Sequence, residues 1–110
     1  MRNDKERLRD ILEAISQIEK YAIQGQTEFQ NNELIQVWVV HHLQIIGEAA
    51  NSLSQKMVTQ HSRVPWSQII AFRNILVHEY FRVDLKAVWK IIERDLPNLK
   101  NKVVDILNNK

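Results

Sequence analysis

The segment from residue 73 to residue 80 holds the side chains best suited to chemistry: Arg73, Asn74, His78 and Tyr80. An imidazole titrates near neutral pH, so His78 can accept or donate a proton in a reaction. The guanidinium of Arg73 can clamp phosphate oxygens and stabilise the charge that develops on them. Asn74 lies one helical turn before His78 and could orient its ring. These residue types suit RNA cleavage without a metal ion, because the 2′-hydroxyl of RNA supplies an internal nucleophile.

A purely structural explanation of the same residues is also open. Arg73 could pair with a carboxylate, and His78 could stabilise the C-terminal end of a helix, where a positive charge is favoured. On an ideal α-helix their side chains point about 140° apart, so the two are not simple neighbours on one face. The residue types alone therefore leave both a catalytic and a structural role open.

Several other kinds of site lack the residues that they need. The chain has no cysteine, which excludes disulfides, thiolate metal sites and cysteine nucleophiles. His41 and His42 are adjacent, so on a helix they point about 100° apart and cannot easily share one ion. Two glycines are too few for a phosphate-binding loop, and no serine lies in a nucleophile elbow. We therefore expect neither a metal nor another cofactor.

The composition predicts one soluble domain, spanning residues 1–110, in a reducing cytoplasm. A chain of 110 residues can form one hydrophobic core, and its two glycines and two prolines are few for the many turns of β-sandwiches and barrels. The N-terminal residues are highly charged, and no apolar run approaches the roughly 20 residues of a membrane helix. The net charge of +2 permits nucleic-acid binding without requiring it.

Hydrophobic periodicity predicts a first helix over about Asp4 to Gln24 and a second over about Glu33 to Leu53, joined by a polar connection over residues 25–32. The second helix is apolar nearly all round in its first half. This indicates burial on more than one side, in the core or against a second subunit. Gly47 within it costs about 1 kcal/mol relative to alanine, so we expect another backbone to pack closely there.

The second half of the chain predicts two further main helices and a short last one. Residues 54–64 are polar and are expected to form a loop, after which Pro65 suits the first turn of a helix that ends near residues 80–81. Asp84 is expected to cap the fourth helix, which ends at residues 95–97 before the short fifth. The whole is expected to be an all-α antiparallel helical bundle.

The segment Arg73-Asn74-Ile75-Leu76-Val77-His78-Glu79-Tyr80 matches the R-x-x-x-x-H-x-Y signature and resembles that of HepT-like toxins in the HEPN superfamily (higher eukaryotes and prokaryotes nucleotide-binding). Residues 46–50 (IGEAA) resemble the I-G-E-A element of the family, and residues 64–66 (VPW) resemble its I-P-W element. Three further groups resemble its closing helices: Val83-Asp84, Val88-Trp89 and Asp95-Leu96-Pro97. The ordered set covers about Val37 to Leu99.

This resemblance implies a HEPN-like fold and a homodimer, or a higher oligomer, in which two motif segments face one another across a cleft. It implies a metal-independent endoribonuclease that leaves a 2′,3′-cyclic phosphate through attack by the 2′-hydroxyl. In that enzyme Arg73 steadies the scissile phosphate, His78 transfers a proton and Asn74 supports the site.

The resemblance also implies a partner, a minimal nucleotidyltransferase of the MNT type that acts as antitoxin in a type II-like pair and adenylylates Tyr80. An alternative within the superfamily is a non-catalytic helical module that binds a nucleotidyltransferase and assists its nucleotide or substrate binding. The intact Arg73 and His78 favour the enzyme, because a binding module needs no histidine for proton transfer.

Other residues carry open alternatives. The three tryptophans, Trp38, Trp66 and Trp89, could stack bases, but their helical spacing favours the core. One of His41 and His42 could line the dimer cleft, and Glu48 is either a solvated acid or a partner for Arg73. The basic residues at four-residue spacing form either a solvated face or a track for an RNA backbone: Arg82, Lys86, Lys90 and Arg94.

Overall fold

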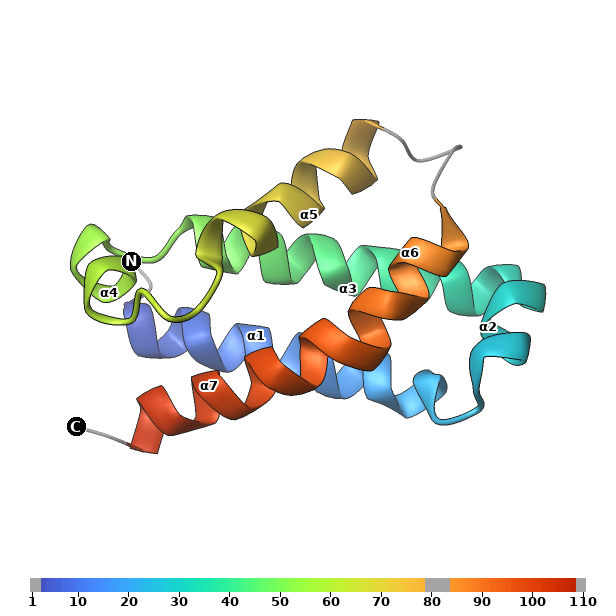
Figure 1. Ribbon diagram of the computed structural model, residues 1–110, viewed down its shortest axis with the longest axis horizontal. Coiled ribbons are helices and arrows are strands. Elements are labelled where there is room, and N and C mark those ends of the chain that lie inside the picture. The colour runs from blue at the N-terminus through green and yellow to red at the C-terminus, as the bar shows by residue number, and fades with distance from the viewer. Residues whose placement is uncertain (1–2, 79–83, 109–110) are drawn as a thin grey trace.

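The computed structural model describes residues 3–78 and 84–108 of the chain, with the side chains of residues 73–78 excepted (Figure 1). The elements are helices α1 (Asp4–Ala22), α2 (Gln26–Asn31), α3 (Glu33–Asn51), α4 (Gln55–Gln60), α5 (Trp66–His78) and α6 (Leu85–Lys90), the π-helical segment η2 (Ile91–Asp95) and α7 (Leu96–Asn108). No strand occurs within these residues. The prediction of an all-α fold is confirmed.

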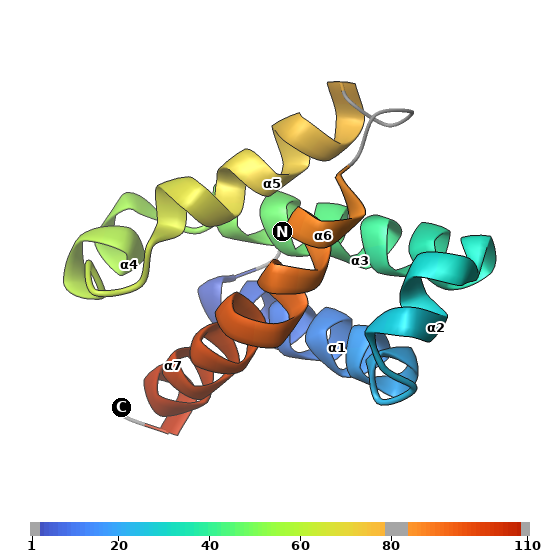
Figure 2. The ribbon, with the colours of Figure 1, turned by 45° about the vertical axis from the view of Figure 1, so that its right-hand side comes forward.

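Helices α1 and α3 form the centre of the molecule. They run antiparallel and pack against each other, with α5 against α3 and α7 against α1 (Figures 1 and 2). α1, α3 and α7 each contribute a stripe of apolar side chains at spacings of three and four. The largest fully buried side chains of the described residues are Leu8, Ile11, Ile15 and Ile18 from α1, Val39, Leu43 and Ile46 from α3, Val103 from α7, and Phe29 from α2.

The connection predicted over residues 25–32 instead contains a helix, α2. The chain turns at Gly25, whose φ of +97° suits glycine because it has no Cβ. Phe29 is 1% exposed and anchors the short helix to the core. Asn32 then caps α3, and its Oδ1 accepts hydrogen bonds from the backbone N–H groups of Leu34 (3.0 Å) and Ile35 (3.3 Å).

The loop predicted over residues 54–64 likewise contains a helix, α4. Ser54 caps it, because its Oγ accepts a hydrogen bond from the N–H of Met57 (3.1 Å). The same hydroxyl donates to the Asp4 carboxylate (2.6 Å), which also accepts from the Ser54 backbone N–H (2.9 Å). This contact joins the start of α1 to the start of α4. A helix of six residues is too short to show a periodic pattern in the sequence.

The predicted break at residues 95–97 is wrong, because α6, η2 and α7 follow one another without interruption. Pro97 lacks an N–H, and in a regular α-helix its ring would clash with the carbonyl group four residues earlier. The π-helical turn changes the local hydrogen bonding: the N–H of Leu96 bonds to the carbonyl of Ile91, five residues back. The wider turn therefore lets the helix continue through the proline.

Candidate functional site

The backbone of the motif segment lies in the second half of α5, where Arg73, Asn74 and His78 follow one another along a single helix. Tyr80 and the side chains of the other three residues lie outside the described part of the structure. The prediction that the motif lies at the end of a helix is confirmed as far as His78. How the four side chains meet stays a prediction, including the support of His78 by Asn74.

The start of α5 is fixed by buried contacts. Trp66 is 4% exposed, and its indole N–H donates a hydrogen bond to the carbonyl oxygen of His61 (3.0 Å). Ile69, one turn further on, is also buried. These contacts hold one end of α5 against the core, so the motif lies at the other end of an anchored helix. Trp66 is a core residue, as its spacing predicted.

The element that follows the motif is anchored as well. Asp84 caps α6 as predicted, and its Oδ1 accepts hydrogen bonds from the N–H groups of Lys86 (2.9 Å) and Ala87 (3.3 Å). Trp89 is 9% exposed, and its ring lies 5.6 Å from that of Phe29, centroid to centroid. The motif segment therefore begins within α5 and is followed by α6, and the core holds both helices in place.

The two adjacent histidines of α3 differ in environment. His42 is 8% exposed, and its Nδ1 lies 2.7 Å from the carbonyl oxygen of Trp38. A carbonyl oxygen can only accept, so this nitrogen carries the proton. His41 is exposed, with its ring centroid 5.0 Å from that of His42. The idea that one of them lines a subunit cleft stays a prediction, and His41 is the accessible one.

Lys86, Lys90 and Arg94 are exposed, whereas Arg82 lies outside the described residues. Lys86 and Lys90 belong to α6 and Arg94 to η2, and their role as a solvated face or as a track for RNA stays a prediction. Glu48 is exposed on α3, and Gly47 beside it is buried.

Within residues 3–78 and 84–108, no group of three or more histidine or acidic side chains could hold a metal ion. The same residues include no helix long and apolar enough to span a membrane.

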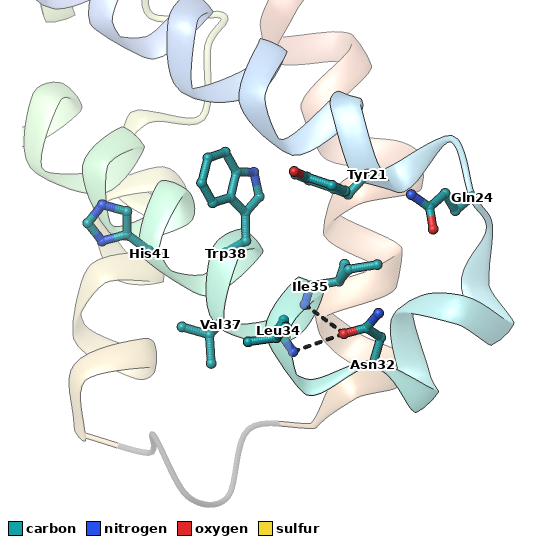
Figure 3. Close-up of a pocket in the computed structure, with 8 residues that line it drawn as sticks. All are labelled: Tyr21, Gln24, Asn32, Leu34, Ile35, Val37, Trp38 and His41. Atoms are coloured by element: carbon teal, nitrogen blue, oxygen red, sulfur yellow. Dashed lines mark hydrogen bonds between the residues drawn. The ribbon is translucent and has the colours of Figure 1, made fainter.

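A surface hollow of about 560 Å³ lies where the end of α1 meets the first half of α3 (Figure 3). Its lining residues are Tyr21, Gln24, Asn32, Leu34, Ile35, Val37, Trp38 and His41. Trp38 is therefore only partly buried, which corrects the prediction that it belongs wholly to the core. Its indole N–H donates to the carbonyl oxygen of Gln17 (2.7 Å), and its ring meets the Tyr21 ring edge to face at 5.5 Å. In the sequence, the apolar residues nearly all round the first half of α3 indicated that this helix has a second apolar side, and the hollow lies on that side.

The helical fold and the motif that begins in α5 agree with the family to which this sequence is similar. Residues 11–106 match the family described as "HepT-like: Ribonuclease HepT-like". The chain belongs to this family.

Two relatives align with nearly the whole chain. "Putative RNase MJ1380" of Methanocaldococcus jannaschii is 36% identical over 103 residues, which cover 93% of this chain and 94% of the relative. "Probable ribonuclease HepT" of Thermococcus cleftensis is 36% identical over 102 residues, which cover 92% and 93%. Both relatives are named as ribonucleases. No solved structure matches the chain significantly.

A third relative is longer. "Gamma-glutamylcyclotransferase and putative RNase MJ0434" of M. jannaschii is 34% identical over 109 residues, which cover 97% of this chain but 49% of that protein. This chain therefore spans about half the length of that relative.

Proposed function

We propose that this protein is the toxin of a toxin–antitoxin pair, an endoribonuclease that cleaves RNA without a metal ion. One observation carries the proposal: the chain contains the complete R-x-x-x-x-H-x-Y motif, whose residues 73–78 lie in the second half of α5, and it matches a ribonuclease family over residues 11–106. A histidine and an arginine are the residue types that such a reaction needs.

In the proposed reaction the 2′-oxygen of RNA attacks the adjacent phosphorus and loses its proton. The bond from phosphorus to the 5′-oxygen breaks, and that oxygen takes up a proton. The products are a 2′,3′-cyclic phosphate and a 5′-hydroxyl end. His78 transfers a proton, Arg73 binds the phosphate oxygens as their charge increases, and Asn74 orients the imidazole. No other reactant is required.

The proposed partner is a nucleotidyltransferase antitoxin that transfers AMP to Tyr80. The hydroxyl group of the tyrosine loses its proton, its oxygen forms a bond to the α-phosphorus of ATP, and pyrophosphate leaves. The added phosphate brings negative charge and bulk beside a site that binds RNA phosphate, so it is expected to repel the substrate. A homodimer, with two motif segments facing one cleft, completes the proposal.

The direct test is cleavage of a defined RNA by the purified protein in EDTA, after intact-mass measurement confirms that it carries no AMP. We expect cleavage at the same rate with and without EDTA, and products with 2′,3′-cyclic phosphate ends. Cleavage that EDTA abolishes would contradict the metal-free mechanism. Absence of cleavage in both buffers would overturn the enzyme and favour a helical module that binds a nucleotidyltransferase.

Tyr80→Phe is expected to prevent transfer of AMP by the antitoxin, because phenylalanine lacks the hydroxyl oxygen that forms the bond to phosphorus. Intact-mass measurement after co-expression with the antitoxin checks this outcome. The chain has two tyrosines, so Tyr21→Phe is a matched control that should still gain AMP. Equal AMP incorporation in wild type and Tyr80→Phe would show that another residue is modified.

A further inference from the structure

A second hollow, of about 340 Å³, lies between α1 and α3 and differs in chemistry from the apolar one. We call it the acidic groove, because two carboxylates line it. Among the residues that the structure describes, its lining consists of Asp10, Glu13, Ala14 and Gln17 from α1 and Trp38, His42 and Ile45 from α3. This set contains no lysine or arginine, so it supplies no positive charge to balance the carboxylates.

His42 presents a hydrogen-bond acceptor to the acidic groove. The residue is 8% exposed, and its Nδ1–H donates to the carbonyl oxygen of Trp38 (2.7 Å). In this tautomer Nε2 carries a lone pair and no proton, so it can only accept. Nε2 has no hydrogen bond to a described residue, yet the Nε of Arg7 is the one side-chain nitrogen or oxygen of the described residues that is both fully buried and unpartnered. The Nε2 atom of His42 therefore reaches the surface, where the residue lines the groove.

The carboxylates of the acidic groove are acceptors as well. Glu13 is exposed, and its Oε1 accepts one hydrogen bond from the Gln17 amide (3.0 Å). A carboxylate has about four acceptor positions, so Glu13 keeps capacity for a further donor. Carboxylates beside an imidazole lone pair favour an occupant that is positively charged and donates hydrogen bonds.

The rest of the lining distinguishes an arginine from other cations. The indole N–H of Trp38 donates to the carbonyl oxygen of Gln17 (2.7 Å), which fixes a ring against which a planar guanidinium can pack. Ala14 and Ile45 offer apolar surface to the methylene stem of a long side chain. A metal ion fits less well, because no three histidine or acidic side chains in the described part of the chain could hold one. An RNA phosphate would be repelled by the carboxylates.

We propose that the acidic groove binds an arginine side chain of a partner protein. The guanidinium packs against Trp38 and donates hydrogen bonds to Glu13 and to Nε2 of His42, while its stem lies on the apolar part of the groove. Because Glu13 is exposed, the groove suits a side chain that reaches in from a partner surface, whereas small molecules are usually enclosed more fully. The site uses no residue of the motif, so it goes beyond the proposed ribonuclease and does not depend on it.

The test is a titration of the ¹⁵N-labelled protein with Nα-acetylargininamide, followed through the indole N–H signals in NMR spectra. The chain has three tryptophans. We expect the signal of Trp38 to shift and those of Trp66 and Trp89, which are buried and do not line the groove, to stay in place. Nα-acetylcitrullinamide has nearly the same shape without the charge. We expect it to bind at least about 10-fold more weakly. Methylguanidinium lacks most of the stem and should also bind more weakly than the arginine compound.

Two variants place the binding in the acidic groove. Glu13→Gln and His42→Leu are each expected to raise the Kd of Nα-acetylargininamide at least about 3-fold, because each removes one acceptor. Glu33→Gln is the matched control, an exposed acid of α3 that does not line the groove. Circular dichroism would confirm the helical content of each variant, and Glu13→Gln changes only an exposed side chain.

Each other outcome contradicts one part of the proposal. A Trp38 signal that does not move over the whole titration would overturn the site. Equal binding of the citrulline compound would overturn the preference for a cation, and equal binding of methylguanidinium would overturn the arginine in favour of a small free cation. A folded Glu13→Gln protein with the Kd of wild type, or an equal loss in Glu33→Gln, would overturn the placement. None of these outcomes bears on RNA cleavage, which is tested separately.

Discussion

His78→Ala is expected to lower the rate of RNA cleavage by about 10²- to 10⁴-fold, the usual contribution of a residue that transfers a proton in the transition state. Alanine keeps the helical backbone of α5 and removes the imidazole. Because α5 is anchored at its other end by Trp66 and Ile69, we expect the fold to persist. Single-turnover cleavage of a defined RNA, wild type beside variant, measures the effect.

His61→Ala serves as the control, because it makes the same substitution outside the motif. The His61 carbonyl that binds Trp66 belongs to the backbone and is retained in the variant. We expect it to cleave RNA at nearly the rate of wild type. If a folded His78→Ala protein cleaved at the wild-type rate, His78 would have no catalytic role.

Phe29→Ala is expected to lower the free energy of unfolding by about 3–5 kcal/mol, the usual cost of removing a buried aromatic ring. The ring is 1% exposed and contacts Trp89, so α2 and α6 lose their shared anchor together. Urea denaturation at one fixed protein concentration measures the change.

Thr27→Ala, an exposed position on the same helix, should change the free energy of unfolding by no more than about 0.5 kcal/mol. A loss below about 1 kcal/mol for Phe29→Ala would mean that α2 contributes little to the core.

The sequence predicted the long helices well and the short ones poorly. α1 and α3 each have 19 residues, which is enough for a repeated apolar stripe to appear. The six residues of α2 contain one buried side chain, and those of α4 contain none, so neither shows a periodic pattern. Their starts depend instead on a glycine with positive φ and on a serine that bonds to Asp4, 50 positions away. The hydrogen bond between Ser54 and Asp4 exists only in the folded chain.

The residues of the candidate site come from the sequence alone, and their roles stay predictions. Arg73 and His78 stood out because of residue type and spacing, and the motif then matched a known family signature. The partial exposure of Trp38 was harder to foresee, because a tryptophan in an apolar helix has the same pattern whether it faces the core or a second subunit. Only the packing of α1 against α3 shows that the side chain of Trp38 stays partly exposed.

The π-helical turn at η2 has a consequence for how the C-terminal helix is oriented. A turn closed by a bond over five residues contains more residues than an α-helical turn, so every side chain beyond it is rotated relative to an unbroken helix. With this rotation Leu99 and Val103 are buried, and Lys100 reaches Glu19 of α1 (3.1 Å). Loss of one residue in η2 would turn α7 by about 100°. The number of residues in η2, and not only their identity, therefore determines which face of α7 meets α1.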